Sequence, residues 1–288
     1  MIRRLCWVMA VLTLWWPGRP SAGEPQVVKF PTGFNGGTSI DGLLVVPDGD
    51  GPFPAVVMLH GCSGLWTKSG KLRRRPAFWS QYLSARGYVV LMADSFRPRG
   101  LGSLCSVRER PVLPNRERPF DAYGALAFLQ ARSDVDPARV ALIGWSNGAM
   151  TMLWTVMEEA SARPAGLTHD FRAAVGFYPG CTAVLRHGFT SRIPTLLQLG
   201  GADDWTPAKP CLRLVAKAKK ARVPIDADVY PGAYHNFDHP SAPVRALVTR
   251  NSVYATGEKR VHSGADPAAR DAAIERVTAF FAAHLQGR

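Results

Sequence analysis

Short apolar runs alternate with amphipathic segments along most of this chain. The run Pro54–Leu59 is apolar throughout, as expected for a strand buried on both faces. Similar runs follow a hairpin-like opening at residues 27–30 and 42–46, and they cover residues 89–93, 140–143, 173–177, 195–199 and 225–229. Amphipathic segments between and after them predict helices at residues 77–86, 119–132, 147–159, 207–222 and 267–285. This alternation predicts an α/β fold, in which a mostly parallel twisted sheet carries helices on both faces.

Two segments, residues 95–118 and 238–266, lack this periodicity. Loops that long in a compact domain are usually functional or disordered. Both follow candidate active-site residues, so we expect them to form the walls of a pocket. With 288 residues, 47% of them apolar, the chain can bury a large core. It contains no internal repeat or low-complexity linker, and we expect one domain over residues 24–288.

The N-terminal residues 1–23 have the pattern of a secretory signal peptide. Two arginines precede an apolar run from Leu5 to Trp16, and small residues follow near Gly23. At about 1.5 Å per residue this run is too short to cross a hydrocarbon core of about 30 Å. We therefore expect cleavage near Gly23, export to the periplasm or the medium, and no stable membrane insertion afterwards.

The net charge of +13, from 35 Lys and Arg against 22 Asp and Glu, favours an anionic partner or simply solubility. The dense basic runs are Lys71–Arg75 and Lys217–Arg222, and aromatic residues do not interleave with either. We interpret both runs as solvated faces and predict no nucleic-acid partner.

The residues Gly144-Trp145-Ser146-Asn147-Gly148 form a G-x-S-x-G motif between a predicted strand and a predicted helix. A sharp turn at this position holds a serine hydroxyl clear of the sheet, which predicts Ser146 as a nucleophile. The alternative is a purely structural strand-to-helix turn. A serine nucleophile needs a base and a carboxylate that orients the base.

Both partners are expected downstream, the acid first and then the histidine, each after a strand. Asp203 and Asp204 follow the predicted strand at residues 195–199, and His235 follows the one at residues 225–229. We favour Asp203 as the orienting acid, while Asp204 remains open and could instead cap the next helix. His60 is the only serious rival to His235 as the base, and its place directly after an early strand suits a structural or oxyanion-loop role better. The remaining histidines, His169, His187, His239, His262 and His284, are expected at the surface or in loops.

Acyl transfer also needs donors that point at the developing oxyanion. The backbone N–H of Asn147, at the start of the helix after Ser146, is one candidate. The loop Leu59-His60-Gly61-Cys62-Ser63-Gly64 supplies the other, and we choose the N–H of Cys62. The alternative for this glycine-rich loop is a tight turn without a catalytic role.

The segments HGCSG, ADSFRPRG, GWSNGA, GADDWTP and YPGAYHNF together resemble the dienelactone hydrolase family of α/β-hydrolases. The resemblance covers nearly all of the chain after the leader. It implies hydrolysis of a small ester or lactone without a metal or cofactor, and a triad of Ser146, Asp203 and His235. The best-known family members use a cysteine nucleophile and are not typically exported, so the resemblance does not fix the substrate.

The resemblance also suggests an arginine in ADSFRPRG that binds an anionic group of the substrate. We favour Arg99 over Arg97, the alternative being that both pair with loop acids. Trp145 and Trp205 are candidate apolar walls of the substrate site, although buried aromatic residues more often belong to the core. Cleavage of the leader removes Cys6 and leaves four cysteines. From their places in the predicted loops we expect disulfides Cys62–Cys105 and Cys181–Cys211, the alternative being unpaired buried thiols.

The sequence thus predicts an exported serine hydrolase that cleaves small carboxylic esters or lactones, anionic ones included, through an acyl-enzyme. On the same fold, an acyltransferase differs only in the acceptor that replaces water, and a peptidase would often carry an extra domain. A catalytically inactive binding protein is the alternative from another class.

Overall fold

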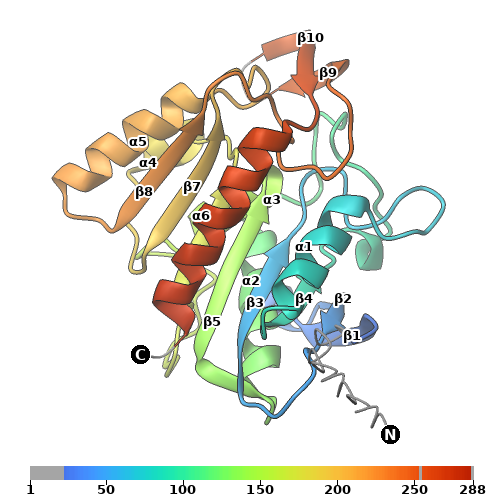
Figure 1. Cartoon of the computed structure of the whole chain (residues 1–288), viewed down its shortest axis with the longest axis vertical. Helices are drawn as coiled ribbons and strands as arrows, with labels where there is room; N and C mark the ends of the chain where they lie inside the picture. The colour runs from blue at the N-terminus through green and yellow to red at the C-terminus, as the bar shows by residue number, and fades with distance from the viewer. Residues whose placement is uncertain (1–22, 253–254, 287–288) are drawn as a thin grey trace, which may run out of the picture.

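The centre of the molecule is an eight-stranded sheet (Figure 1). The structure is a computed structural model that describes residues 23–252 and 255–286, so the predicted leader lies outside the described residues except for Gly23. In space the strands follow the order β1-β2-β4-β3-β5-β6-β7-β8. β1 and β2 run antiparallel to their neighbours, and the other strands are parallel. The strands are β1 (Gln26–Pro31), β2 (Ser39–Val45), β3 (Phe53–Leu59), β4 (Val89–Ala93), β5 (Val135–Trp145), β6 (Ala173–Phe177), β7 (Thr195–Gly200) and β8 (Ile225–Tyr230).

Helices cover both faces of this sheet. α1 and α6 pack on one face, and α2, α3, α4 and α5 pack on the other (Figure 1). The α-helices are α1 (Arg74–Ser84), α2 (Arg118–Gln130), α3 (Asn147–Thr155), α4 (Thr182–His187), α5 (Ala208–Lys220) and α6 (Pro267–Leu285), and two 3-10 helices are η1 (Phe34–Gly36) and η2 (Arg97–Arg99). The predicted fold class is therefore confirmed.

The two helical layers enclose two hydrophobic cores, and β3 shows how one strand serves both. Ala55, Val57 and Leu59 belong to the core beneath α2 and α3. Val56 and Met58 alternate with them and face the core beneath α1 and α6. Because side chains alternate across a strand, a strand that is buried on both faces must be apolar throughout, which is the pattern seen in the sequence.

Besides the two 3-10 helices, three elements were not predicted. α4 has only six residues, too few to show a helical period. β9 (Arg245–Ser252) and β10 (Ala255–Ser263) form a two-stranded antiparallel hairpin within the segment that lacked periodicity. This hairpin lies beyond the end of the sheet at which β7 and β8 finish (Figure 1).

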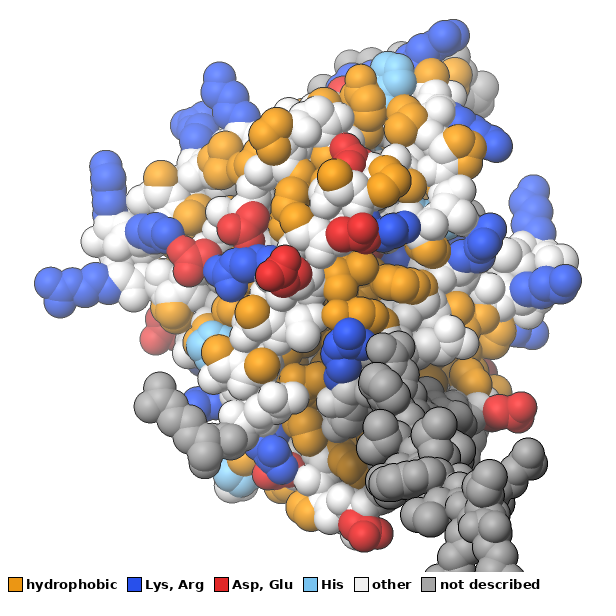
Figure 2. Space-filling model, viewed as in Figure 1, with side chains coloured by type: hydrophobic (Ala, Val, Ile, Leu, Met, Phe, Trp, Pro, Cys, Tyr) orange, Lys and Arg blue, Asp and Glu red, His pale blue; other side chains and the backbone are white. Residues whose placement is uncertain are grey.

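Lys and Arg side chains are scattered over the face shown in Figure 2, with apolar side chains between them. Within residues 23–252 and 255–286, no helix is both long enough and apolar enough to cross a bilayer.

Candidate active site

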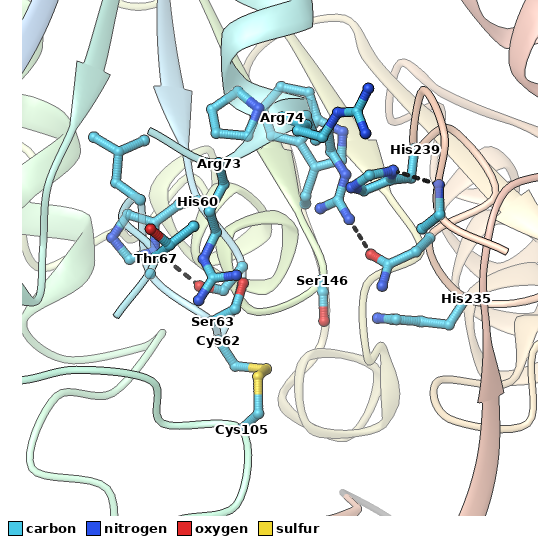
Figure 3. A pocket seen from close by; sticks show the side chains of 18 of the residues that line it. His60, Cys62, Ser63, Thr67, Arg73, Arg74, Cys105, Ser146, His235 and His239 are labelled. Carbon is cyan, nitrogen blue, oxygen red and sulfur yellow. Dashed lines mark hydrogen bonds between the residues drawn. A yellow bond between two sulfur atoms is a disulfide. The ribbon is translucent and has the colours of Figure 1, made fainter. Parts of the chain in front are cut away.

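Ser146 occupies a strained turn between β5 and α3. Its φ of 51° and ψ of −111° lie outside the regions that residues with a side chain usually adopt. Two glycines make the turn possible. A Cβ on Gly144 would lie 2.4 Å from the carbonyl oxygen of Gly148, and a Cβ on Gly148 would lie 2.0 Å from that of Leu59. The G-x-S-x-G pattern therefore reflects close backbone packing, which presents the Ser146 hydroxyl to the cavity (Figure 3).

His235 follows β8 and is held by Asp203, which follows β7. The Nδ1 atom of His235 lies 2.8 Å from Oδ2 of Asp203, and both side chains are buried. A carboxylate only accepts hydrogen bonds, so Nδ1 carries the proton and Nε2 is free to accept one. Figure 3 shows the imidazole of His235 directed toward Ser146.

Asp203 is itself fixed by three further donors. Its Oδ1 accepts hydrogen bonds from the backbone amides of Trp205, at 2.9 Å, and Thr206, at 2.8 Å. Its Oδ2 accepts one from the Thr206 hydroxyl at 3.0 Å. Such a carboxylate is oriented before any substrate arrives.

Asp204, the alternative acid, points elsewhere. Its Oδ1 accepts the backbone N–H of His262 at 2.7 Å, and its Oδ2 lies 2.8 Å from the Nδ1 atom of His262. It does not cap α5, whose N-cap residue is Pro207 without a side-chain hydrogen bond. Instead, Asp204 ties β10 to the loop that carries Asp203.

The loop after β3 lies directly against Ser146. A Cβ on Gly61 would lie 3.7 Å from the Cβ of Ser146 and 3.3 Å from the carbonyl oxygen of Trp145. Cys62 follows at once and lines the same cavity as Ser146. Asn147 begins α3, where the first amides have no acceptor within the helix. The two expected oxyanion donors therefore belong to segments that meet at Ser146.

One buried cation, Arg118, joins the segments that carry these donors. Its guanidinium donates to the His60 carbonyl at 2.9 Å, to Oδ1 of Asn147 at 2.5 Å and to the Ser95 hydroxyl at 3.2 Å. Burial lowers the pKa of Arg118 to about 10, so it stays charged at neutral pH. Arg118 could not be singled out from the sequence, because its partners His60, Ser95 and Asn147 come from three separate segments.

His60 is buried beside Arg118 and belongs to the same group of hydrogen-bonded residues. Its Nδ1 lies 2.8 Å from the Gly61 carbonyl, and its Nε2 accepts the Ser95 amide at 3.1 Å. Burial and the charge of Arg118 lower the pKa of His60 well below its usual value, so the ring is neutral. Both ring nitrogens of His60 have hydrogen-bond partners, which fits the structural role expected for this residue.

A cavity of about 590 Å³ opens above these residues. Both segments without periodicity contribute to its wall, through Cys105 and Ser106 on one side and through Leu247 and Val248 of the hairpin on the other. Trp205 lines it with its ring centroid 4.8 Å from that of His235. Trp145 also lines it, although this residue is buried and donates its indole N–H to Asp238 at 2.7 Å. The volume suits a small organic ligand.

The expected role of Arg99 in substrate binding is wrong. Arg99 does not line the cavity. Its guanidinium makes two hydrogen bonds to the buried carboxylate of Asp121, at 2.7 and 3.0 Å, and a third to the Ser95 carbonyl at 2.7 Å. A buried carboxylate requires a partner, and Arg99 is that partner for Asp121. Its guanidinium is therefore not directed toward a substrate.

The arginines that do line the cavity are Arg73, Arg74 and Arg75, at the start of α1. This run was interpreted as a solvated face, which is wrong for Arg73 and Arg75, whose side chains are partly buried. Arg75 faces the buried Asp238 at 3.4 Å. Figure 3 shows the guanidinium of Arg73 reaching into the cavity near Cys62 and Ser63.

Asp238 is a second site residue that sequence analysis missed. Its carboxylate accepts hydrogen bonds from Tyr178, at 2.5 Å, and from the indoles of Trp79 and Trp145, at 2.9 and 2.7 Å. Burial raises the pKa of Tyr178 well above its usual value, so its hydroxyl remains a donor. Only its place three residues after His235 could have drawn attention to Asp238.

Disulfides join Cys62 to Cys105 and Cys181 to Cys211, the pairs expected from the sequence. In the part of the chain that the structure describes, no cluster of three or more His, Cys, Asp or Glu residues is arranged to hold a metal ion.

An eight-stranded, mostly parallel sheet with a serine at a strand-to-helix turn defines an α/β-hydrolase fold. Residues 40–285 match the dienelactone hydrolase family. The chain belongs to this family and is a hydrolase.

Among curated proteins, it is 28% identical over 232 residues to an uncharacterised protein of Mycobacterium tuberculosis, covering 75% of this chain and 73% of that protein. Among solved structures, a putative dienelactone hydrolase from Klebsiella pneumoniae is 15% identical with a TM-score of 0.63, covering 90% of this chain and 99% of that one. Esterase 2 from Thermogutta terrifontis, phosphorylated by paraoxon, is 17% identical with a TM-score of 0.63, covering 94% of this chain and 98% of that one. These two structural likenesses concern the fold.

Proposed function

We propose that this protein is a serine esterase that cleaves small carboxylic esters or lactones through an acyl-enzyme. The observation that carries the proposal is that Ser146 and His235 line one cavity, while the buried Asp203 carboxylate lies 2.8 Å from Nδ1 of His235. His235 Nε2 accepts the Ser146 proton as Oγ attacks the ester carbonyl, and the imidazolium then returns that proton to the leaving alkoxide. The backbone amides of Cys62 and Asn147 stabilise the oxyanion.

Water completes the cycle by the same route in reverse. His235 deprotonates the water, which attacks the acyl carbonyl, and Ser146 leaves with the proton. Because a lactone carries its alcohol on the acyl chain, its opening would use the same residues and release a hydroxy acid.

Substitution of Ser146 tests this reaction. We expect Ser146→Ala to lower kcat on a short-chain aryl ester by roughly 10⁴- to 10⁶-fold, because the nucleophile is lost. Labelling with a fluorophosphonate, followed by peptide mapping, should place the adduct on Ser146 in the wild type. Equal rates in the variant and the wild type would refute the assignment, and a folded wild type that is not labelled would favour the inactive binding protein.

We further propose that the preferred ester carries an anionic group, such as a carboxylate, that Arg73 binds. The Nε atom of Arg73 is buried and has no hydrogen-bond partner. Among the described residues that line the cavity there is no Asp or Glu to pair with it. Burial, and next the charge of Arg75, lower the pKa of Arg73. The environment therefore destabilises the positive charge of Arg73, and a bound anion would stabilise it.

A pair of matched esters tests this anion site. Arg73→Met should lower kcat/KM for an aryl hydrogen succinate by about 10- to 100-fold, the value of a charged hydrogen bond, and should hardly affect the uncharged butyrate ester. Arg213→Met, on the exposed surface of α5, removes the same charge far from the cavity and should affect neither ester. Equal losses on both esters would contradict a role for Arg73 in anion recognition.

We also propose that the protein works outside the cytoplasm. Two disulfides favour an oxidising compartment, and residues 1–23 have the pattern of an export signal. N-terminal sequencing of the protein from its native cells should begin near Glu24, whereas a start at Met1 would contradict export by cleavage.

A further inference from the structure

The two disulfides occupy different environments. Cys181 and Cys211 are both fully buried, they join the residue before α4 to α5, and they lie outside the cavity wall. Cys62 and Cys105 both line the cavity beside Ser146, and Cys105 is partly exposed. Only the Cys62–Cys105 disulfide is therefore attached to a residue of the proposed oxyanion hole.

The loop that carries Cys62 makes a tight turn, in which the Gly61 carbonyl accepts the Gly64 amide at 3.2 Å, and the segment of Cys105 contacts this turn from the cavity side. It contains Gly61 and Gly64, and Gly64 has a φ of +78°. Its carbonyl at Cys62 accepts the Leu104 amide at 2.8 Å, so the segment next to Cys105 reaches it through one hydrogen bond as well as the disulfide. That segment is mostly irregular. It contains η2, and three of its side chains, Phe96, Leu104 and Val112, pack together in a small buried cluster.

We propose that Cys105 is a positioning residue, whose disulfide holds the backbone amide of Cys62 at the place where the oxyanion forms. The inference rests on the proposed esterase mechanism. An oxyanion donor stabilises the transition state only if its N–H is already aimed at the developing charge, because reorganisation during the reaction costs the energy that it would supply. Arg118 holds this loop from inside the protein through the His60 carbonyl, and the disulfide holds it from the cavity side.

It follows that reduction should switch the enzyme to a slow form. A dithiol reagent gives two electrons and two protons to the Cys62–Cys105 bond, which becomes two thiols, while the reagent closes to its own disulfide. Access decides which disulfide reacts, so Cys62–Cys105 should be reduced in the folded protein before the fully buried Cys181–Cys211.

The test is a titration of the whole oxidised protein with a dithiol, followed by mass mapping of alkylated thiols and steady-state kinetics on a neutral aryl ester. One lost oxyanion donor costs about 10²–10³ in kcat, so a displaced donor should lower kcat and kcat/KM together by roughly 10- to 100-fold at constant KM. Reoxidation should restore both. The variant Cys62→Ala/Cys105→Ala should show the same loss without any reductant.

The second disulfide provides the control. Cys181→Ala/Cys211→Ala should lower the melting temperature but keep the wild-type kcat at a temperature where it is folded. Unchanged kcat after mapped reduction of Cys62 and Cys105 would overturn the proposal. So would a rise in KM at constant kcat, because the disulfide would then only shape the cavity. Failure of the esterase mechanism itself would appear earlier, as a fully oxidised protein that neither turns over the ester nor labels at Ser146.

Discussion

The cavity has two walls that are built in different ways. The first, which we call the catalytic wall after the proposed mechanism, contains Ser146, His235 and the loop of Cys62, with Asp203 behind His235. Each of these follows a strand of the central sheet. The binding wall consists of Cys105 and Ser106 from the irregular segment after β4, of His239, Leu247 and Val248 from the segment after His235, and of the arginines at the start of α1. Parallel strands end at a common edge of the sheet, so the sheet alone brings the catalytic wall together, whereas the binding wall depends on contacts between distant segments.

The largest loss of activity is expected from a substitution of Asp203, next to the catalytic wall. Asp203→Asn would place an amide, as a donor or a weaker acceptor, next to Nδ1 of His235. This favours the tautomer whose proton is on Nε2, and that nitrogen then cannot accept the proton of Ser146. We expect kcat to fall by about 10⁴-fold with little change in KM. Steady-state kinetics on an aryl ester, with circular dichroism to verify folding, measures this.

Asp204→Asn is the matched control for that loss. It removes the same charge one residue away and weakens the contact with His262 on the hairpin, where the carboxylate lies 2.8 Å from the ring. We therefore expect kcat to stay within a few-fold of the wild type. A larger loss in Asp204→Asn than in Asp203→Asn would reverse the assignment of the orienting acid.

A smaller effect is expected at the binding wall. Leu247 on β9 is 38% exposed and lines the cavity, so a substrate with an extended apolar group would cover it. Leu247→Ser should raise KM for such an ester by about 3- to 10-fold, the value of losing roughly 1 kcal/mol of apolar burial, without lowering kcat. Esters with short and long acyl chains, compared in one assay, give the measurement.

Leu212 on α5 offers a control of the same residue type and similar exposure. It is 42% exposed and lies outside the cavity wall, so Leu212→Ser should leave KM unchanged for both esters. If Leu247→Ser behaves in the same way, the hairpin takes no part in substrate binding, and the binding wall is smaller than the cavity suggests.

The difference between the walls also explains what could be predicted from the sequence. Ser146 could be found because Gly144 and Gly148 are needed locally for its turn, and Asp203 and His235 because each follows an apolar strand. The central strands and the long helices could be found for the same reason, since their periodicity is a local property.

The rest depends on contacts that no local pattern encodes. Arg99 was assigned to the substrate from the family resemblance, and no local pattern shows that it pairs with Asp121, which lies 22 residues away on α2. Arg73 appeared to belong to a solvated basic run until the fold placed the start of α1 over the cavity. The hairpin was missed because its strands lack the continuous apolar run of a central strand, and they pair mainly with each other.

The smallest effect concerns stability at the binding wall, where His239 lines the cavity. Burial first, and then the charge of Arg75, lower the pKa of His239 to about 4, whereas a histidine in the unfolded chain titrates near about 6.5. Between these values the unfolded chain binds a proton that the folded protein does not, so the free energy of unfolding falls as the pH falls through this range. His239→Asn should remove that contribution, because an asparagine oxygen can still accept the amides of Ser241 and Ala242, which lie 3.2 and 2.9 Å from Nδ1.

Denaturant unfolding at several pH values between about 7 and about 4.5 measures the difference. The slope of unfolding free energy against pH should be shallower in His239→Asn, by less than the limit of about 1.4 kcal/mol per pH unit for one proton, because His239 is partly exposed. A residual slope should remain from His60, whose pKa burial also lowers and which the variant does not touch. Identical slopes in variant and wild type would contradict a contribution of His239 to the acid sensitivity of the protein.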